Sequence, residues 1–186
     1  MKLIERLSRR VAFTAFGALA ACALLGSALR QGPDDALSKL SYPRTIIVLR
    51  HAEKATEPAE DPFISEKGAE RAHRLATLLG HSGVTHMFAS EFQRTQQTLA
   101  PLAVAVGVQP QVVAAREPAA LASALESLPR GAVAVVAGHS NTVPALLEKL
   151  TGGAAKITLT DSDYDRVFVV TQWGPGRSAC ALELRY

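Results

Sequence analysis

From Thr45 onward, short apolar runs alternate with longer segments whose apolar residues recur every three or four positions. Short apolar runs are typical of buried strands, and a period near 3.6 residues is typical of amphipathic helices. Strands are therefore predicted at 45–49, 84–89, 110–113 and 131–138, with shorter ones at 156–160, 165–171 and 179–184. Helices are predicted at 65–80, 93–107, 118–128 and 141–152. The first of these helices is expected to place Ala69, Ala72, Leu75, Leu78 and Leu79 on one face.

The segment GAVAVVAG at 131–138 is apolar throughout, as expected for a strand that is covered on both faces. Strands that alternate with helices indicate a layered α/β domain with a mainly parallel sheet. We expect a three-layer α/β/α fold, with helices on both faces of the central sheet. Ligands of such sheets bind just beyond the carboxyl ends of the strands, so functional residues should follow the strands.

Residues 1–30 are predicted to be a signal peptide or membrane anchor outside the fold. A basic stretch, MKLIERLSRR, precedes 19 uncharged residues from Val11 to Leu29. That run is long for a signal-peptide core and close to the ~20 residues that span a bilayer. LAAC at 19–22 resembles a lipobox, which would make Cys22 the lipidated residue. We expect export to the periplasm or membrane, with a leader that is cleaved, lipidated or retained.

The rest of the chain is predicted to be a linker at 31–44 and one domain at 45–186. The net charge of the whole chain is +3, but residues 1–30 carry +4, so the remainder carries −1. Because this part has no basic excess, no nucleic-acid partner is expected. Cys180 is its single cysteine, which excludes an internal disulfide, and its place in ACALEL predicts a small buried side chain.

Unusual residues follow three of the predicted strands. Arg50 and His51 follow the first strand, Arg94 comes shortly after the second, and His139 follows the apolar run at 131–138. If these strands are neighbours, two arginines and two histidines converge. A phosphoryl group suits such a pocket, because it carries nearly two negative charges and accepts hydrogen bonds at three oxygens. An imidazole can also attack phosphorus near neutral pH.

Four segments together resemble the signature regions of the histidine phosphatase superfamily, also called phosphoglycerate-mutase-like. They are RHAEK, DPFISEKGAERA, FASEFQRTQQT and VAGHSNTVP, in the family's order within 45–150. The resemblance implies a phosphoglycerate-mutase-like fold and His51 as the phosphorylated nucleophile. It also implies that Arg50, Arg94 and His139 complete the phosphate pocket. Because Asn141 is next to that pocket, it is expected to help bind substrate. The chain's size resembles that of the short members, which include phosphohistidine and small-phosphomonoester phosphatases.

The acid that protonates the leaving oxygen is the one role with several candidates. In one branch of the family it follows the second histidine, where this chain has Ser140. In the other branch it comes after the third strand, where Glu117 is the nearest carboxylate, with Glu91 in reserve. Some phosphohistidine phosphatases need no acid, since imidazole leaves more easily than an alkoxide. Glu53 and Lys54 either line the entrance or are solvated.

We therefore expect a phosphatase that hydrolyses a phosphomonoester or protein phosphohistidine, without metal or cofactor. The five histidines include no His-x-His or His-x₃-His pair, so no metal site is expected, and His73, His81 and His86 are expected at the surface or in loops. AGHSNT resembles a nucleophile elbow, but no histidine follows Ser140, as an α/β-hydrolase requires. The surviving alternative is a non-catalytic module that binds phosphate or phosphoproteins. The oligomeric state is left open.

Overall fold

The computed structural model describes residues 42–173 and 179–186. Its strands are β1 (Arg44–Arg50), β2 (His86–Ala89), β3 (Gln111–Val112), β4 (Val133–Gly138), β5 (Arg166–Gln172) and β6 (Cys180–Arg185). Its helices are α3 (Glu66–Leu79), α4 (Gln93–Val106), α5 (Pro118–Ser127) and α6 (Thr142–Leu150). The predicted order of elements is confirmed, apart from the strand at 156–160.

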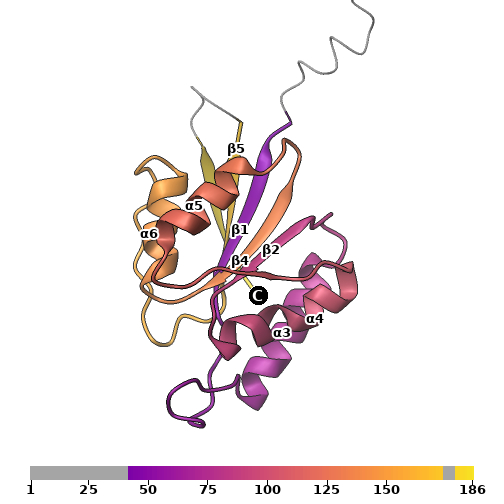
Figure 1. The fold of residues 1–186 in the computed structure, drawn as a ribbon, viewed down its shortest axis with the longest axis vertical. Coiled ribbons are helices and arrows are strands. Elements are labelled where there is room, and N and C mark those ends of the chain that lie inside the picture. Colours follow the sequence, from indigo (N-terminus) through magenta and orange to yellow (C-terminus); the bar gives the residue numbers. More distant parts are fainter. Residues whose placement is uncertain (1–41, 174–178) are drawn as a thin grey trace, which may run out of the picture. The chain divides into compact units, whose positions relative to one another are not determined.

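The six strands form one sheet in the order β3-β2-β4-β1-β5-β6 (Figure 1). The four strands from β3 to β1 run parallel to one another, and β5 and β6 are antiparallel to their neighbours. The mainly parallel α/β fold is therefore confirmed, with an antiparallel hairpin added at one edge. Because β4 lies between β1 and β2, the carboxyl ends of all three strands meet.

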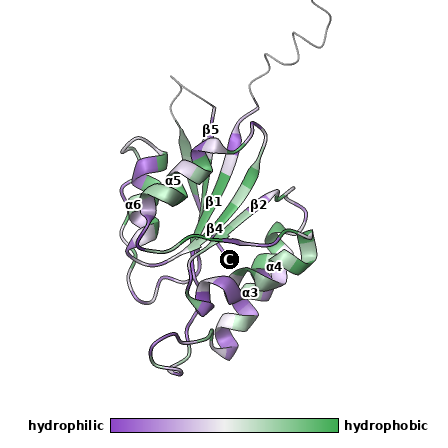
Figure 2. Ribbon diagram, viewed as in Figure 1, coloured by the Kyte–Doolittle hydropathy of each residue, from purple (hydrophilic) through white to green (hydrophobic). Residues whose placement is uncertain are grey.

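Helices cover the sheet on both faces, with α5 and α6 on one side and α3 and α4 on the other (Figure 1). Successive side chains of β1 pack on opposite faces of the sheet, each against a different pair of helices. Ile46 and Val48 pack on the side of α5 and α6, whereas Ile47 and Leu49 pack on the side of α3 and α4. In Figure 2 the central strands are accordingly hydrophobic along most of their length. Since both faces are buried, the strands need the continuous apolar runs seen in the sequence.

The helix α3 begins as its sequence indicates, because the Ser65 side chain accepts a hydrogen bond of 3.1 Å from the Gly68 N–H. Ala72, Leu75 and Leu79 are buried as expected. Ala69 is half-buried, and the prediction that Leu78 shares this face is wrong, since it is 48% exposed. The buried stripe of α3 includes Arg71 instead, and Leu78 lies beyond its edge.

Two further predictions are wrong, and the sheet edges explain both. Residues 156–160 form an extended loop rather than a strand. Leu159 is buried against the α5 and α6 layer, but both edges of the nearby β5 are already paired. Cys180 is exposed rather than buried, because it lies on the edge strand β6, whose residues are all exposed.

The helix α4 continues through Pro101 to Val106, so the proline does not end it. No helix within 42–173 and 179–186 is long and apolar enough to cross a bilayer. The predicted leader at 1–30, with Cys22, and nearly all of the predicted linker lie outside the described residues.

Candidate active site

The residues predicted to bind phosphate lie around one cavity at the carboxyl ends of β1, β2 and β4. The cavity has a volume of about 620 Å³, and its walls include Arg50, His51, Arg94, His139 and Asn141. Arg50 pairs in register with Gly138, so the residues that follow these two strands stand side by side. The parallel pairing of neighbouring strands therefore brings together four charged or basic side chains that are far apart in the sequence.

Gly138 allows the chain to turn sharply from β4 into α6. A Cβ atom there would lie 3.0 Å from the Thr142 Oγ1 and 3.1 Å from a Val143 methyl group. The Thr142 hydroxyl accepts a hydrogen bond of 2.9 Å from the His139 N–H, and the Val143 N–H donates to the His139 carbonyl at 3.0 Å. This tight turn fixes the backbone of His139 at the cavity.

His51 is held with one ring nitrogen available. The ring is 4% exposed, and its Nδ1 lies 2.7 Å from the Ala52 carbonyl oxygen. Because a carbonyl only accepts, Nδ1 carries the proton and the lone pair lies on Nε2. The Ala52 N–H donates to the Thr98 hydroxyl at 2.8 Å, which ties this backbone to α4. Burial, together with the nearby His139 and arginines, lowers the pKa of His51 to about 4, although the Ala52 hydrogen bond opposes this.

His139 is neutral for similar reasons. Burial lowers its pKa to about 4, helped by the Arg94 charge and opposed by Glu91. Its Nε2 lies 2.9 Å from the Ser90 hydroxyl, which is 2.9 Å from the Thr95 hydroxyl. The two histidine rings are 5.3 Å apart, edge to face. At neutral pH the site therefore presents two uncharged imidazoles between two guanidinium groups.

Arg50 is 5% exposed and has hydrogen-bonding capacity to spare. Its Nη1 donates to the Thr160 carbonyl at 2.7 Å, and its guanidinium carbon lies 4.2 Å from the centre of the Tyr164 ring. The buried Nε has no hydrogen-bond partner among the described residues. A buried donor without a partner is costly, so this atom points to a ligand that accepts a hydrogen bond.

Arg94 is oriented by the loop that precedes α3. Its Nη1 lies 3.5 Å from the Asp61 carboxylate, and its guanidinium carbon is 4.3 Å from the centre of the Phe92 ring. The same carboxylate accepts the Gln93 N–H at 3.1 Å, at the start of α4. Asp61 therefore stabilises the helix terminus and the position of Arg94 together.

Comparison with known proteins finds a family model and solved structures that are similar to this chain. A family model described as the histidine phosphatase superfamily (branch 1) matches residues 46–115. Over these residues the chain is similar to the histidine phosphatase superfamily. The match to this superfamily supports an enzyme of the phosphatase or mutase type. No curated protein sequence matches the chain.

Solved structures share the fold at low sequence identity. The protein histidine phosphatase SixA complexed with tungstate has a TM-score of 0.62 and 18% identity, covering 76% of this chain and 96% of its own. A mycobacterial glucosyl-3-phosphoglycerate phosphatase has a TM-score of 0.58 and 14% identity, with coverages of 77% and 98%. Phosphoglycerate mutase from Plasmodium falciparum has a TM-score of 0.56 and 14% identity, with coverages of 77% and 91%. These likenesses show that the chain has the fold of the superfamily.

The candidate acids lie around the cavity rather than within it. Glu117 is exposed just before α5 and is not among the lining residues, although its neighbour Arg116 is. The Glu91 carboxylate accepts the Ala115 N–H at 2.7 Å. Although burial opposes it, this hydrogen bond and the positive charge of Arg116 lower the pKa of Glu91, so less of it is protonated and available to act as an acid at neutral pH. Asn141 lines the cavity and is exposed.

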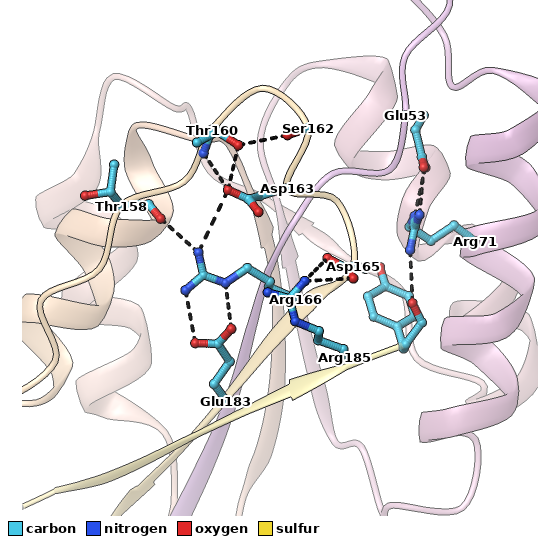
Figure 3. Close-up of polar contacts among 11 residues, drawn as sticks. Glu53, Arg71, Thr158, Thr160, Ser162, Asp163, Asp165, Arg166, Glu183 and Arg185 are labelled. Carbon is cyan, nitrogen blue, oxygen red and sulfur yellow. Dashed lines mark hydrogen bonds and ion pairs between the residues drawn. The ribbon is translucent and has the colours of Figure 1, made fainter.

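Glu53 and Lys54 have separate places. Glu53 forms a double hydrogen bond with Arg71 of α3, at 2.7 and 2.8 Å, and Arg71 also donates to the Tyr186 carbonyl at 3.0 Å (Figure 3). Burial would raise the pKa of Glu53, but Arg71 lowers it to about 2. Gly68 permits this docking, since a Cβ atom there would collide with the Glu53 carbonyl oxygen. Lys54, by contrast, lines the cavity.

Asp161 and Tyr164 are among the residues of the cavity wall that sequence reasoning did not single out. Asp161 is fully exposed and lies 3.7 Å from Arg50 Nη2, which is also 3.4 Å from the Tyr164 hydroxyl. Their loop is held to the β5–β6 hairpin by Arg166, which contacts the Thr158 carbonyl and Asp163 (Figure 3). No sequence motif marked this loop, because its place depends on that docking.

The other predicted site features have simple outcomes. His73 and His81 are exposed, as expected. The prediction for His86 is wrong, because it is half-buried at the start of strand β2 rather than in a loop, with its ring beside the Thr85 hydroxyl. Within the two described ranges, no three His, Cys, Asp or Glu side chains cluster so as to hold a metal ion.

Proposed function

We propose that the chain is a phosphatase that hydrolyses a phosphomonoester or a protein phosphohistidine through a phosphohistidine on His51. The observation that carries this is the state of the His51 ring. Its Nδ1–H is bound to the Ala52 carbonyl, and its pKa of about 4 leaves it neutral at physiological pH. Nε2 is therefore a free nucleophile on the wall of a cavity that also holds Arg50 and Arg94.

The first step forms a bond from His51 Nε2 to phosphorus and breaks the bond from phosphorus to the leaving group. Arg50 and Arg94 neutralise the charge of the phosphoryl oxygens, and the unpartnered Arg50 Nε donates to one of them. His139 lies beside His51 and stabilises the equatorial oxygens. In the second step water attacks phosphorus, the bond to Nε2 breaks, and inorganic phosphate leaves.

The leaving oxygen of an ester needs a proton, and we propose Glu117 as its donor. Glu117 is the carboxylate that the resemblance implies, and its neighbour Arg116 lines the cavity. Asp161 is the competing donor, because it is the carboxylate of the cavity wall itself. A phosphohistidine substrate makes a smaller demand for this proton, since imidazole is the better leaving group.

Turnover of phenyl phosphate and of a phosphohistidine peptide tests the proposal, with wild type and His51→Ala compared. A trapped phosphoenzyme that is stable to alkali and labile to acid is expected with wild type alone. Full activity of His51→Ala would exclude the mechanism. Phosphate binding without turnover of either substrate would favour the non-catalytic binding module.

We also propose that the domain is exported and acts in the periplasm or at a membrane. The support is the basic stretch followed by 19 uncharged residues at 11–29. Sequencing the mature N-terminus and testing Cys22 for lipid would separate the cleaved, lipidated and retained forms. Recovery of the intact chain in the cytoplasmic fraction would contradict export.

A further inference from the structure

A second cavity, with a volume of about 610 Å³, lies beside the phosphate pocket. It lies between α5, α6 and the carboxyl ends of β2 and β4. The two cavities share Ala115, Arg116, His139, Asn141 and Thr142. Because Arg116 and Asn141 are exposed, both cavities open to solvent along this shared rim.

The second cavity differs chemically from the first. Its walls are mostly aliphatic and aromatic, with Phe88, Val113, Leu121, Val143 and Leu146 among them. No carboxylate is among its lining residues, and its lysine and arginine are exposed. A concave apolar surface with a few polar groups at one end is the usual form of a small-molecule site.

Small side chains keep this space open. Ala119 of α5 and Ala145 of α6 line the cavity from its two helices, and both are exposed. Further alanines line its base, at positions 89, 114 and 137. In Figure 1, α5 and α6 lie together over one face of the sheet. Larger residues at the two helical positions would occupy the opening between the helices.

We propose that this cavity binds the leaving group of the substrate, and that the leaving group is an apolar alcohol or phenol. The proposal rests on the proposed phosphatase function. A phosphoryl group held by Arg50 and Arg94 would have its ester oxygen near the shared rim. An apolar group attached to that oxygen would be removed from contact with water when it enters the second cavity. Alkyl and aryl phosphates are therefore the preferred class, ahead of sugar phosphates and phosphohistidine.

The test measures kcat/KM for n-alkyl phosphates from methyl to hexyl, together with phenyl phosphate. For wild type, kcat/KM should rise about fourfold for each added CH₂ until the cavity is filled. Ala119→Leu and Ala145→Leu should flatten this rise. Ala120→Leu is the matched control, because Ala120 is exposed on α5 and does not line the cavity.

Binding of n-alkylphosphonates, measured by calorimetry on the full chain, gives a second readout that needs no turnover. Affinity should rise with chain length in wild type and in Ala120→Leu, and should stay flat in the two filling variants. If methyl and hexyl phosphates are hydrolysed equally well, the apolar subsite is excluded while the phosphatase remains. If no substrate is hydrolysed but phosphonates still bind with rising affinity, the subsite stands and the phosphatase proposal fails.

Discussion

Two buried arginines, Arg50 at the end of β1 and Arg71 in α3, differ in how many of their hydrogen-bond donors have a partner in the protein. Arg71 is 7% exposed, and its Nε, Nη1 and Nη2 all donate, to the Glu53 carboxylate and the Tyr186 carbonyl. Arg50 is 5% exposed, its Nε has no partner among the described residues, and its nearest carboxylate, on Asp161, is fully exposed. A guanidinium whose three nitrogens all have hydrogen-bond partners, here called filled, stabilises the fold. One with an unpartnered nitrogen, here called unfilled, is available to bind a ligand.

The largest expected effect comes from the residue beside Arg50. His51→Ala should lower kcat by at least about 10³-fold, because it removes the nucleophile. The folded state should persist, since the ring forms one hydrogen bond to its neighbour's carbonyl. Steady-state kinetics and circular dichroism measure the two effects. His73→Ala, at an exposed position of α3, is the control. An equal loss of kcat in this variant would contradict the assignment of His51 as the nucleophile.

Exchanging the two arginines for alanine should separate binding from stability. Arg50→Ala should raise the Kd for inorganic phosphate by about 10- to 100-fold, because it removes a charge-assisted contact. Arg71→Ala should lower the free energy of unfolding by about 3 kcal/mol, because it leaves the half-buried Glu53 carboxylate with the exposed Lys67, at 3.5 Å, as its remaining ion-pair partner. Calorimetry and urea unfolding provide the measurements. If Arg50→Ala proves the more destabilising of the two, the distinction between filled and unfilled arginines is wrong.

The place of Arg50 in a phosphate pocket could be predicted from the sequence, but the burial of Arg71 and its pairing with Glu53 could not. Arg50, His51 and His139 follow apolar runs, and the carboxyl ends of parallel strands meet by geometry alone. Arg71 resembles any charged residue of an amphipathic helix, and its guanidinium is buried in contact with Glu53 and Tyr186, which are distant from it in the sequence. Asp161 and Tyr164 reach the pocket through the docking of a loop. The exposure of Cys180 likewise depends on which strand lies at the sheet edge.

The pH dependence of stability should also differ between the two regions. The pKa of Glu53 is lowered to about 2, so the stability gained from Arg71 is complete above about pH 4.5 and is lost as pH falls toward 2. His51 and His139 have pKa values lowered to about 4. The unfolded chain therefore takes up their protons first, and stability falls between pH 6.5 and 4.

Urea unfolding at pH values from 7 to 3, in buffers without phosphate, measures both windows. His51→Ala should reduce the slope between pH 6.5 and 4 by at most about 1.4 kcal/mol per pH unit. Glu53→Gln should leave that slope unchanged and flatten the dependence below pH 4.5. If the His51 variant keeps the full wild-type slope, the neutral buried imidazole is not the state of the folded protein.

The smallest expected effect belongs to Asp161, the exposed carboxylate that lies 3.7 Å from Arg50. Asp161→Asn should tighten phosphate binding by less than about fivefold, because an exposed ion pair is weak and its loss frees Arg50 for the ligand. The change should be the same for phenyl phosphate and for a phosphohistidine peptide.

Glu117→Gln should instead lower turnover of alkyl phosphates and spare the phosphohistidine peptide. If Asp161→Asn shows that selective loss and Glu117→Gln does not, Asp161 is the proton donor, and the carboxylate beside the unfilled arginine takes part in catalysis rather than competing with phosphate.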